Sequence, residues 1–134
     1  MKVLQHTVLF TLDKIDDKTW SKIQAIANEL GKLPGVISFS FQPAEVGLYK
    51  EHEDRRGGYT HILISVFKDE SALKHYDESK AHGEWKQVIK PHLTKPVLAF
   101  DSWQHNFPEF ALFGHTMASK PGLATAEPGG WVTK

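Results

Sequence analysis

Residues 59–85, "YTHILISVFKDESALKHYDESKAHGEW", decide the fold because they join a strand to an interrupted helix. The opening "YTHILISVF" is apolar on both sides and predicts a buried strand. Asp69 is a suitable N-cap for a helix that runs to about Tyr76. The residues after Tyr76 favour a break, and a second helical piece is expected over Ala81–Lys90.

The remaining elements follow from the same kinds of pattern. Residues 2–12 alternate and predict a strand, and "DDKTWSKIQAIANELGK" predicts a helix that ends near Lys32, before Pro34-Gly35. Further strands are predicted in "VISFSFQPAEVGLY" and "KPVLAFDSWQ". The order β-α-β-β-α-β indicates an α+β, ferredoxin-like fold with a four-stranded antiparallel sheet.

We expect the first and third strands of this fold to lie side by side and parallel at the centre of the sheet. Both helices then cover one face. The other face of the third strand carries Ile62, Ile64 and Val66, so it also needs a cover. A second subunit is the simplest cover, and the sequence therefore predicts a homodimer.

Composition limits the classes of partner. The chain has 134 residues, with 16 Lys and Arg against 16 Asp and Glu, so no net positive charge favours nucleic acid. No stretch has the length of a membrane span and there is no cysteine, so we expect neither membrane nor thiolate chemistry, and a cytoplasmic location. One domain is predicted over residues 1–107, followed by an extended or partly disordered C-terminal extension, residues 108–134.

Three histidines and a tyrosine are candidates for a small-molecule site. If the first and third strands are parallel neighbours, His6 and His61 share one end of the sheet. The returning, interrupted helix then brings Tyr76 and His82 over the same end. Each residue alone is more often a satisfied core or rim group, but together they suggest a ligand pocket. No HExxH motif or recognisable carboxylate spacing supports a metal site.

Four segments carry a resemblance to a known family: "HTVLFTL", "LPGVISF", "GYTHILISVF" and "ALKHYDESKAH". Over about residues 2–105 they resemble the stress-responsive A/B-barrel (Dabb) family of dimeric α+β barrels, and within it polyketide cyclases of the olivetolic acid cyclase type. The resemblance implies a homodimer that acts on a small molecule. It also implies functional roles for His6, His61, Tyr76 and His82.

The expected reaction is a cofactor-independent, aldol-type ring closure of a polyketide-like substrate. His82 would be the general base and Tyr76 a hydrogen-bond donor, while His6 and His61 would bind substrate oxygens. Other cofactor-free reactions in the same pocket remain open: pericyclic cyclisation, lyase, isomerase or monooxygenase chemistry. A non-catalytic dimeric stress or small-molecule-binding protein is the alternative class, and it would have a pocket filled by side chains.

Overall fold

The computed structural model describes residues 1–109 and has the ferredoxin-like α+β fold predicted from the sequence. The predicted extension over residues 108–134 lies outside the described residues, except for its first two. The elements, in chain order, are β1 (Val3–Phe10), α1 (Asp17–Gly31), β2 (Val36–Pro43), β3 (His61–Phe67), α2 (Glu70–Glu78), α3 (Lys80–Ile89), the short 3-10 helix η1 (Lys90–His92) and β4 (Leu98–Gln104).

The sheet has the strand order β2-β3-β1-β4, and every neighbouring pair is antiparallel. The prediction that β1 and β3 are neighbours is confirmed, but the prediction that they run parallel is wrong. The crossover through α1 makes β2 parallel to β1, and the antiparallel pairing of β2 with β3 then reverses β3 relative to both. As a result His61 lies opposite Phe10, whereas His6 lies opposite Ser65.

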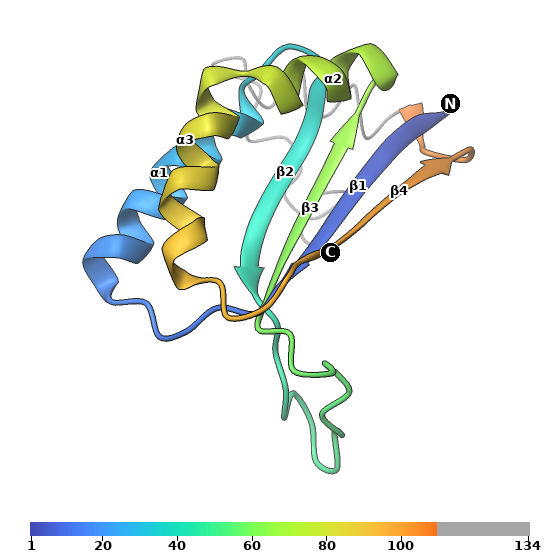
Figure 1. Ribbon diagram of the computed structural model, residues 1–134. Coiled ribbons are helices and arrows are strands. Elements are labelled where there is room, and N and C mark those ends of the chain that lie inside the picture. Colours follow the sequence, from blue (N-terminus) through green and yellow to red (C-terminus); the bar gives the residue numbers. More distant parts are fainter. Residues whose placement is uncertain (110–134) are drawn as a thin grey trace, which may run out of the picture.

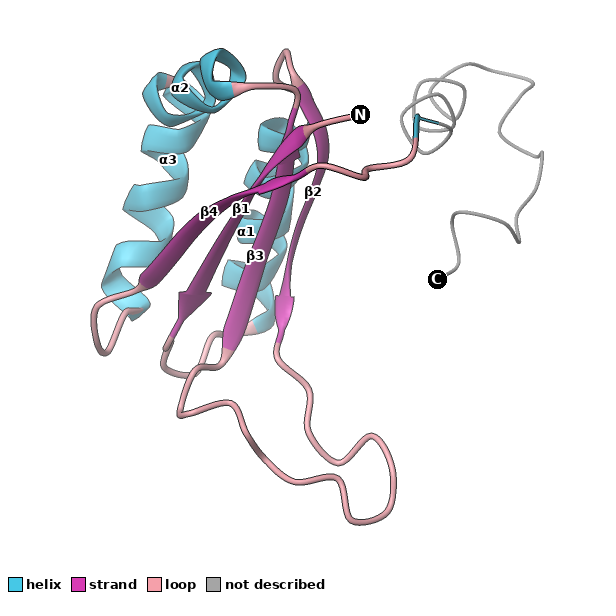
Figure 2. Ribbon diagram, turned by 90° about the vertical axis from the view of Figure 1, so that its right-hand side faces the viewer, coloured by secondary structure: helices cyan, strands magenta, loops and turns pink. Residues whose placement is uncertain are grey.

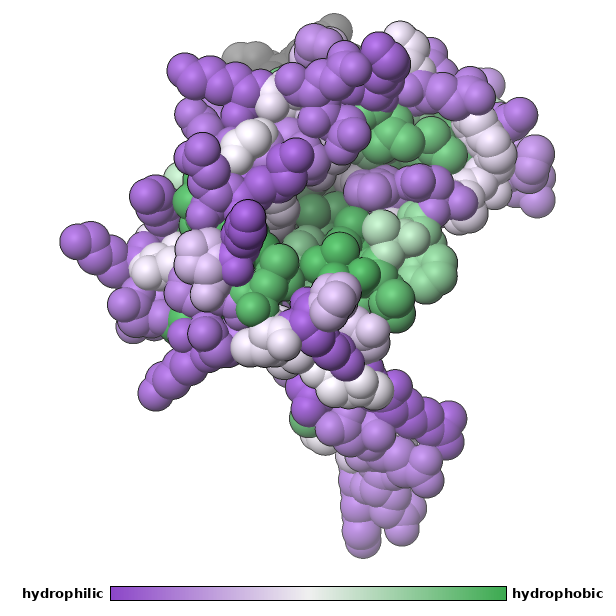
Figure 3. Space-filling model, viewed as in Figure 1, coloured by the Kyte–Doolittle hydropathy of each residue, from purple (hydrophilic) through white to green (hydrophobic). Residues whose placement is uncertain are grey.

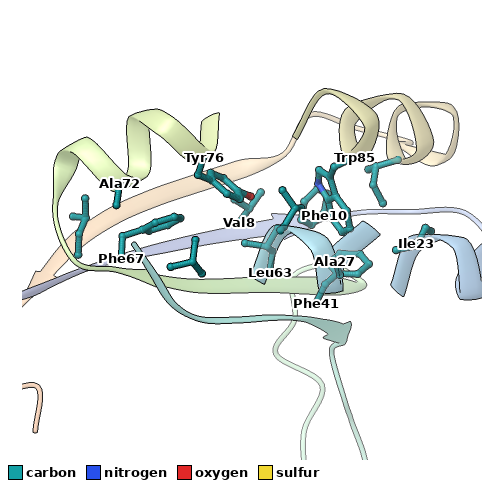
Figure 4. Close-up of a cluster of buried hydrophobic side chains, with 14 of the residues drawn as sticks. Val8, Phe10, Ile23, Ala27, Phe41, Leu63, Phe67, Ala72, Tyr76 and Trp85 are labelled. Carbon is teal, nitrogen blue, oxygen red and sulfur yellow. The ribbon is translucent and has the colours of Figure 1, made fainter. Parts of the chain in front are cut away.

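The helices form one layer on one face of the sheet (Figure 1, Figure 2). The main core lies between the two layers, where Tyr76 and Trp85 reach from the helices toward Val8 and Phe10 on β1 (Figure 4). Phe41 and Phe67 on the outer and central strands are almost fully buried in the same core. Within residues 1–109, no helix combines the length and apolar character needed to cross a membrane.

The opposite face of the sheet is only partly covered by the described residues. Thr7 pairs with Ile64 on one side and with Phe100 on the other, which gives one row across this open face. Ile64 and Phe100 are 38% and 54% exposed, and neighbouring Leu98 is 41% exposed. Apolar side chains of this size at the centre and edge of a sheet are typical of a surface that another layer covers.

The turn between α1 and β2 needs a glycine. Gly35 has a φ of +83°, and a Cβ atom placed on it would lie 2.4 Å from the Cβ of Ala72 in α2. Its carbonyl accepts a hydrogen bond of 2.9 Å from the backbone N–H of Lys68. The turn therefore brings the backbone close to α2, and the predicted helix stop at Pro34-Gly35 is also a packing contact.

We predict that Gly35→Ala lowers the free energy of unfolding by about 2 kcal/mol or more, because both the backbone conformation and the contact with Ala72 oppose a side chain. Urea denaturation measures the loss. Gly83→Ala is the matched control, because its added Cβ would meet no atom within 4 Å and alanine favours the helix by up to about 1 kcal/mol. Equal stability of the two variants would contradict the packing argument.

Candidate functional site

A cavity of about 390 Å³ lies between the helix layer and the β1–β4 side of the sheet. Figure 3 shows apolar surface gathered in the hollow between α3 and β4, with hydrophilic residues around it. The cavity is lined by His6, Val8, Phe10, Leu63, Tyr76, His82, Trp85, Lys86, Ile89, Lys90, Leu93, Val97 and Ala99. Apolar walls with a few convergent polar groups are typical of a small-molecule site.

Ser79 forms the junction between α2 and α3, where the sequence predicted a helix break. Its backbone N–H and its hydroxyl both donate to the carbonyl of Tyr76, at 3.1 and 2.8 Å, and so end α2. Its hydroxyl oxygen also accepts from the backbone N–H of His82 at 3.1 Å, which caps the start of α3. One serine therefore connects the backbones of both candidate catalytic residues.

Tyr76 is 1% exposed and lies at the centre of an aromatic group. Its ring centroid is 4.8 Å from that of His82 and 6.1 Å from that of His6. Burial raises the pKa of the phenol, so the hydroxyl stays protonated near neutral pH. Tyr76 lines the cavity, and among residues 1–109 its hydroxyl forms no hydrogen bond, so this group is available to a ligand.

The His82 side chain is 13% exposed, and its Nδ1 lies 3.0 Å from the carbonyl oxygen of Asp77. Because a carbonyl only accepts, Nδ1 carries the hydrogen and Nε2 is left with its lone pair. Burial lowers the pKa of this imidazole. The carbonyl and the carboxylate of Asp77 oppose that shift, and nearby Lys86 and His6 add to it. His82 is therefore a neutral imidazole at neutral pH and is suited to accept a proton.

His6 reaches the cavity from β1 and is held by a partner on β4. His6 and Asp101 are directly paired across the two strands, and Nδ1 of His6 lies 2.6 Å from Oδ1 of Asp101. The carboxylate accepts this hydrogen bond, so it fixes the ring and leaves Nε2 for a ligand. The prediction that His6, Tyr76 and His82 lie at one site agrees with this geometry.

His61 does not join that site. Antiparallel pairing places it opposite Phe10, four residues along β1 from His6, or about 13 Å at the usual rise of a strand. Its ring stacks on Phe41 at 5.4 Å, and its Nδ1 lies 2.7 Å from the hydroxyl oxygen of Thr60. Burial lowers the pKa of this imidazole. The expectation that it shares a pocket with His6 was wrong because it assumed parallel strands.

The sequence reasoning also missed residues of the site. Asp101 and the two lysines of the lining, Lys86 and Lys90, were not singled out. The signal for Asp101 is the pairing register of β1 with β4, which a single sequence does not reveal. The lysines follow His82 at positions i+4 and i+8, a helical spacing that was available from the sequence.

No group of three histidine, aspartate or glutamate side chains within residues 1–109 is arranged to hold a metal ion. The polar groups of the cavity are imidazoles, one phenol and two ammonium groups, a set suited to proton transfer and to binding oxygen atoms.

Comparison with known proteins agrees with the sequence motifs. Residues 4–104 match the family model described as the Stress responsive A/B Barrel Domain. No curated protein matches the sequence.

Solved structures with the same fold come from plants and bacteria. A hydroxynitrile lyase from Passiflora edulis is 20% identical, with a TM-score of 0.63 over 79% of this chain and 97% of that one. An Arabidopsis thaliana protein is 24% identical, with a TM-score of 0.59 over 74% and 92% of the two chains. A dimeric ferredoxin-like protein from Thermobifida fusca is 16% identical, with a TM-score of 0.58 over 75% and 90%. At these identities the likeness concerns the fold.

We predict that His82 titrates in the folded protein below the ordinary value of 6.5. The unfolded chain then takes up this proton at a higher pH than the folded chain does. Below pH 6.5, the contribution of His82 to the free energy of unfolding therefore falls until the folded form is also protonated. Proton NMR of the imidazole measures the titration, and His82→Gln identifies its signal. A midpoint at or above 6.5 would contradict the burial argument.

Proposed function

The chain belongs to the stress-responsive A/B barrel domain family, and we propose that its cavity catalyses a cofactor-independent reaction on a small carbonyl compound. The reaction that suits the site best is an intramolecular aldol closure of a polyketide-like chain. The observation that carries this proposal is the contact between Tyr76 and His82, with ring centroids 4.8 Å apart, at the wall of an apolar cavity.

The proposed first step is removal of a proton from a carbon next to a carbonyl. Nε2 of His82 accepts the proton, and the hydroxyl of Tyr76 donates a hydrogen bond to the enolate oxygen that develops. The enolate carbon then attacks a second carbonyl of the same molecule, which forms the carbon–carbon bond. The resulting alkoxide takes a proton from His82, and the imidazole returns to its neutral state.

The walls of the cavity would contribute by holding the substrate in a coiled shape. Phe10, Trp85 and Ile89 present apolar surface from the sheet and from α3. Bringing two ends of a flexible chain together in the correct orientation removes much of the entropic barrier to ring closure. Nε2 of His6, whose orientation is fixed by Asp101, would bind a substrate oxygen further along the chain.

Two other functions use the same cavity. A non-catalytic protein that binds a small molecule would use the open space of about 390 Å³ without any turnover, although such a protein was expected from the sequence to have a pocket filled by side chains. The second function is a lyase, which breaks a bond next to a carbonyl instead of forming one. A base and a phenol can also assist such a cleavage. Identification of the product, as a ring or as two fragments, separates ring closure from cleavage.

We also propose that the protein is a homodimer formed through the open face of the sheet, as a dimeric α+β barrel. The exposed row that includes Ile64 and Phe100 supports this proposal. We predict that Phe100→Asp converts a dimer into a monomer, because a charge buried in such an interface is costly. Light scattering measures the mass. Ala25→Asp, at an exposed position of α1, is the control. A wild-type monomer would contradict the proposal.

We predict that His82→Ala abolishes turnover of a linear polyketide thioester and that Tyr76→Phe lowers kcat by about 100-fold, the usual effect of losing one such donor. Mass spectrometry of the cyclic product follows the reaction. His75→Ala is the matched control, because His75 lies next to Tyr76 on α2 but is exposed and outside the cavity. Full activity of both site variants would end the assignment.

A further inference from the structure

The charged residues that line the cavity all have one sign. Lys86 and Lys90 are its formally charged members, and no aspartate or glutamate belongs to the lining. Asp101, which lies behind His6, already accepts a hydrogen bond from that imidazole. Within residues 1–109, neither lysine forms an ion pair with a carboxylate, whereas Lys74 on α2 and Lys32 at the C-terminal end of α1 do so. Two uncompensated positive charges therefore border an apolar space.

The lysines follow one line along the helical segment that carries His82. His82 and Lys86 lie in α3, and Lys90, whose backbone is still helical, follows directly at the start of η1. Because these residues are spaced by four, successive members lie on the same side and about 6 Å apart along the helix axis. Both lysines are exposed although they line the cavity. A lysine in this situation lays its methylene groups on the apolar wall and keeps the ammonium in water. The ammonium groups therefore mark the mouth, and His82 lies deeper.

We infer that the natural ligand of this cavity is an amphiphile with an apolar body and an anionic group, and that Lys86 and Lys90 bind the anion at the mouth. This inference rests on the proposed function of the same cavity and adds the chemical class of its substrate. The anion is a carboxylate of the reacting chain or a phosphate of a carrier attached to it. In both cases the apolar body reaches inward toward Tyr76 and His82, and the charge stays at the surface.

The test is a binding measurement with probes that undergo no reaction. Isothermal titration of the full chain compares octanoate, octyl phosphate and octanol, which share an alkyl chain and differ in the end group. We expect at least one anion to bind about fivefold or more tightly than octanol, and we expect added salt to weaken only the anions. The preferred anion distinguishes a carboxylate from a carrier phosphate.

The variant Lys86→Gln/Lys90→Gln should reduce the advantage of the anion to less than about twofold and leave octanol binding unchanged. The matched control is Lys18→Gln/Lys22→Gln, which removes the same charge from exposed positions of α1 outside the cavity. Equal binding of all three probes to the wild type would overturn the inference, as would an equal loss in both double variants.

These outcomes are separate from those of the proposed reaction. The probes contain no carbonyl group with an acidic neighbouring proton that could close a ring, so a protein that binds but does not catalyse gives the same binding pattern. Loss of turnover in His82→Ala with no preference for anions would retain the proposed chemistry and reject the anionic ligand. A preference for anions without any ring product would do the reverse.

Discussion

The hydrogen bonds of Ser79 are the constraint on which the arrangement of the site depends. Through them the carbonyl of Tyr76 ends one helix and the N–H of His82 begins the next. A continuous helix would place residues six positions apart on different sides, because six residues correspond to about 600° of rotation. The break changes the direction of the chain after Tyr76, and both rings then meet above the same cavity.

Burial gives the two rings complementary protonation states. The same enclosure raises the pKa of the Tyr76 phenol and lowers the pKa of the His82 imidazole. The phenol is therefore a donor and the imidazole an acceptor at neutral pH. In the neutral imidazole, the carbonyl of Asp77 holds the hydrogen on Nδ1 and so leaves Nε2 as the acceptor. Apolar packing and one backbone contact thus supply the donor and the acceptor that the proposed proton transfer needs.

The sequence predicted the elements of the fold well, because the periodic patterns and the turn at Pro34-Gly35 are local signals. The relative direction of β1 and β3 is a property of the whole topology, and the wrong choice there misplaced His61. Tyr76 still meets His6, because α2 begins beside the end of the sheet where Phe67 pairs with Leu4. Asp101 was missed because its role depends on the register between two strands far apart in the chain.

The central claim is that this cavity removes a proton from a carbon next to a carbonyl, and hydrogen–deuterium exchange tests it most directly. A medium-chain methyl ketone is incubated with the protein in deuterated buffer, and NMR follows the loss of its α-proton signals. The account predicts exchange well above the buffer rate, without any need for ring closure. Exchange at the buffer rate, with the ketone shown to be bound, would contradict it.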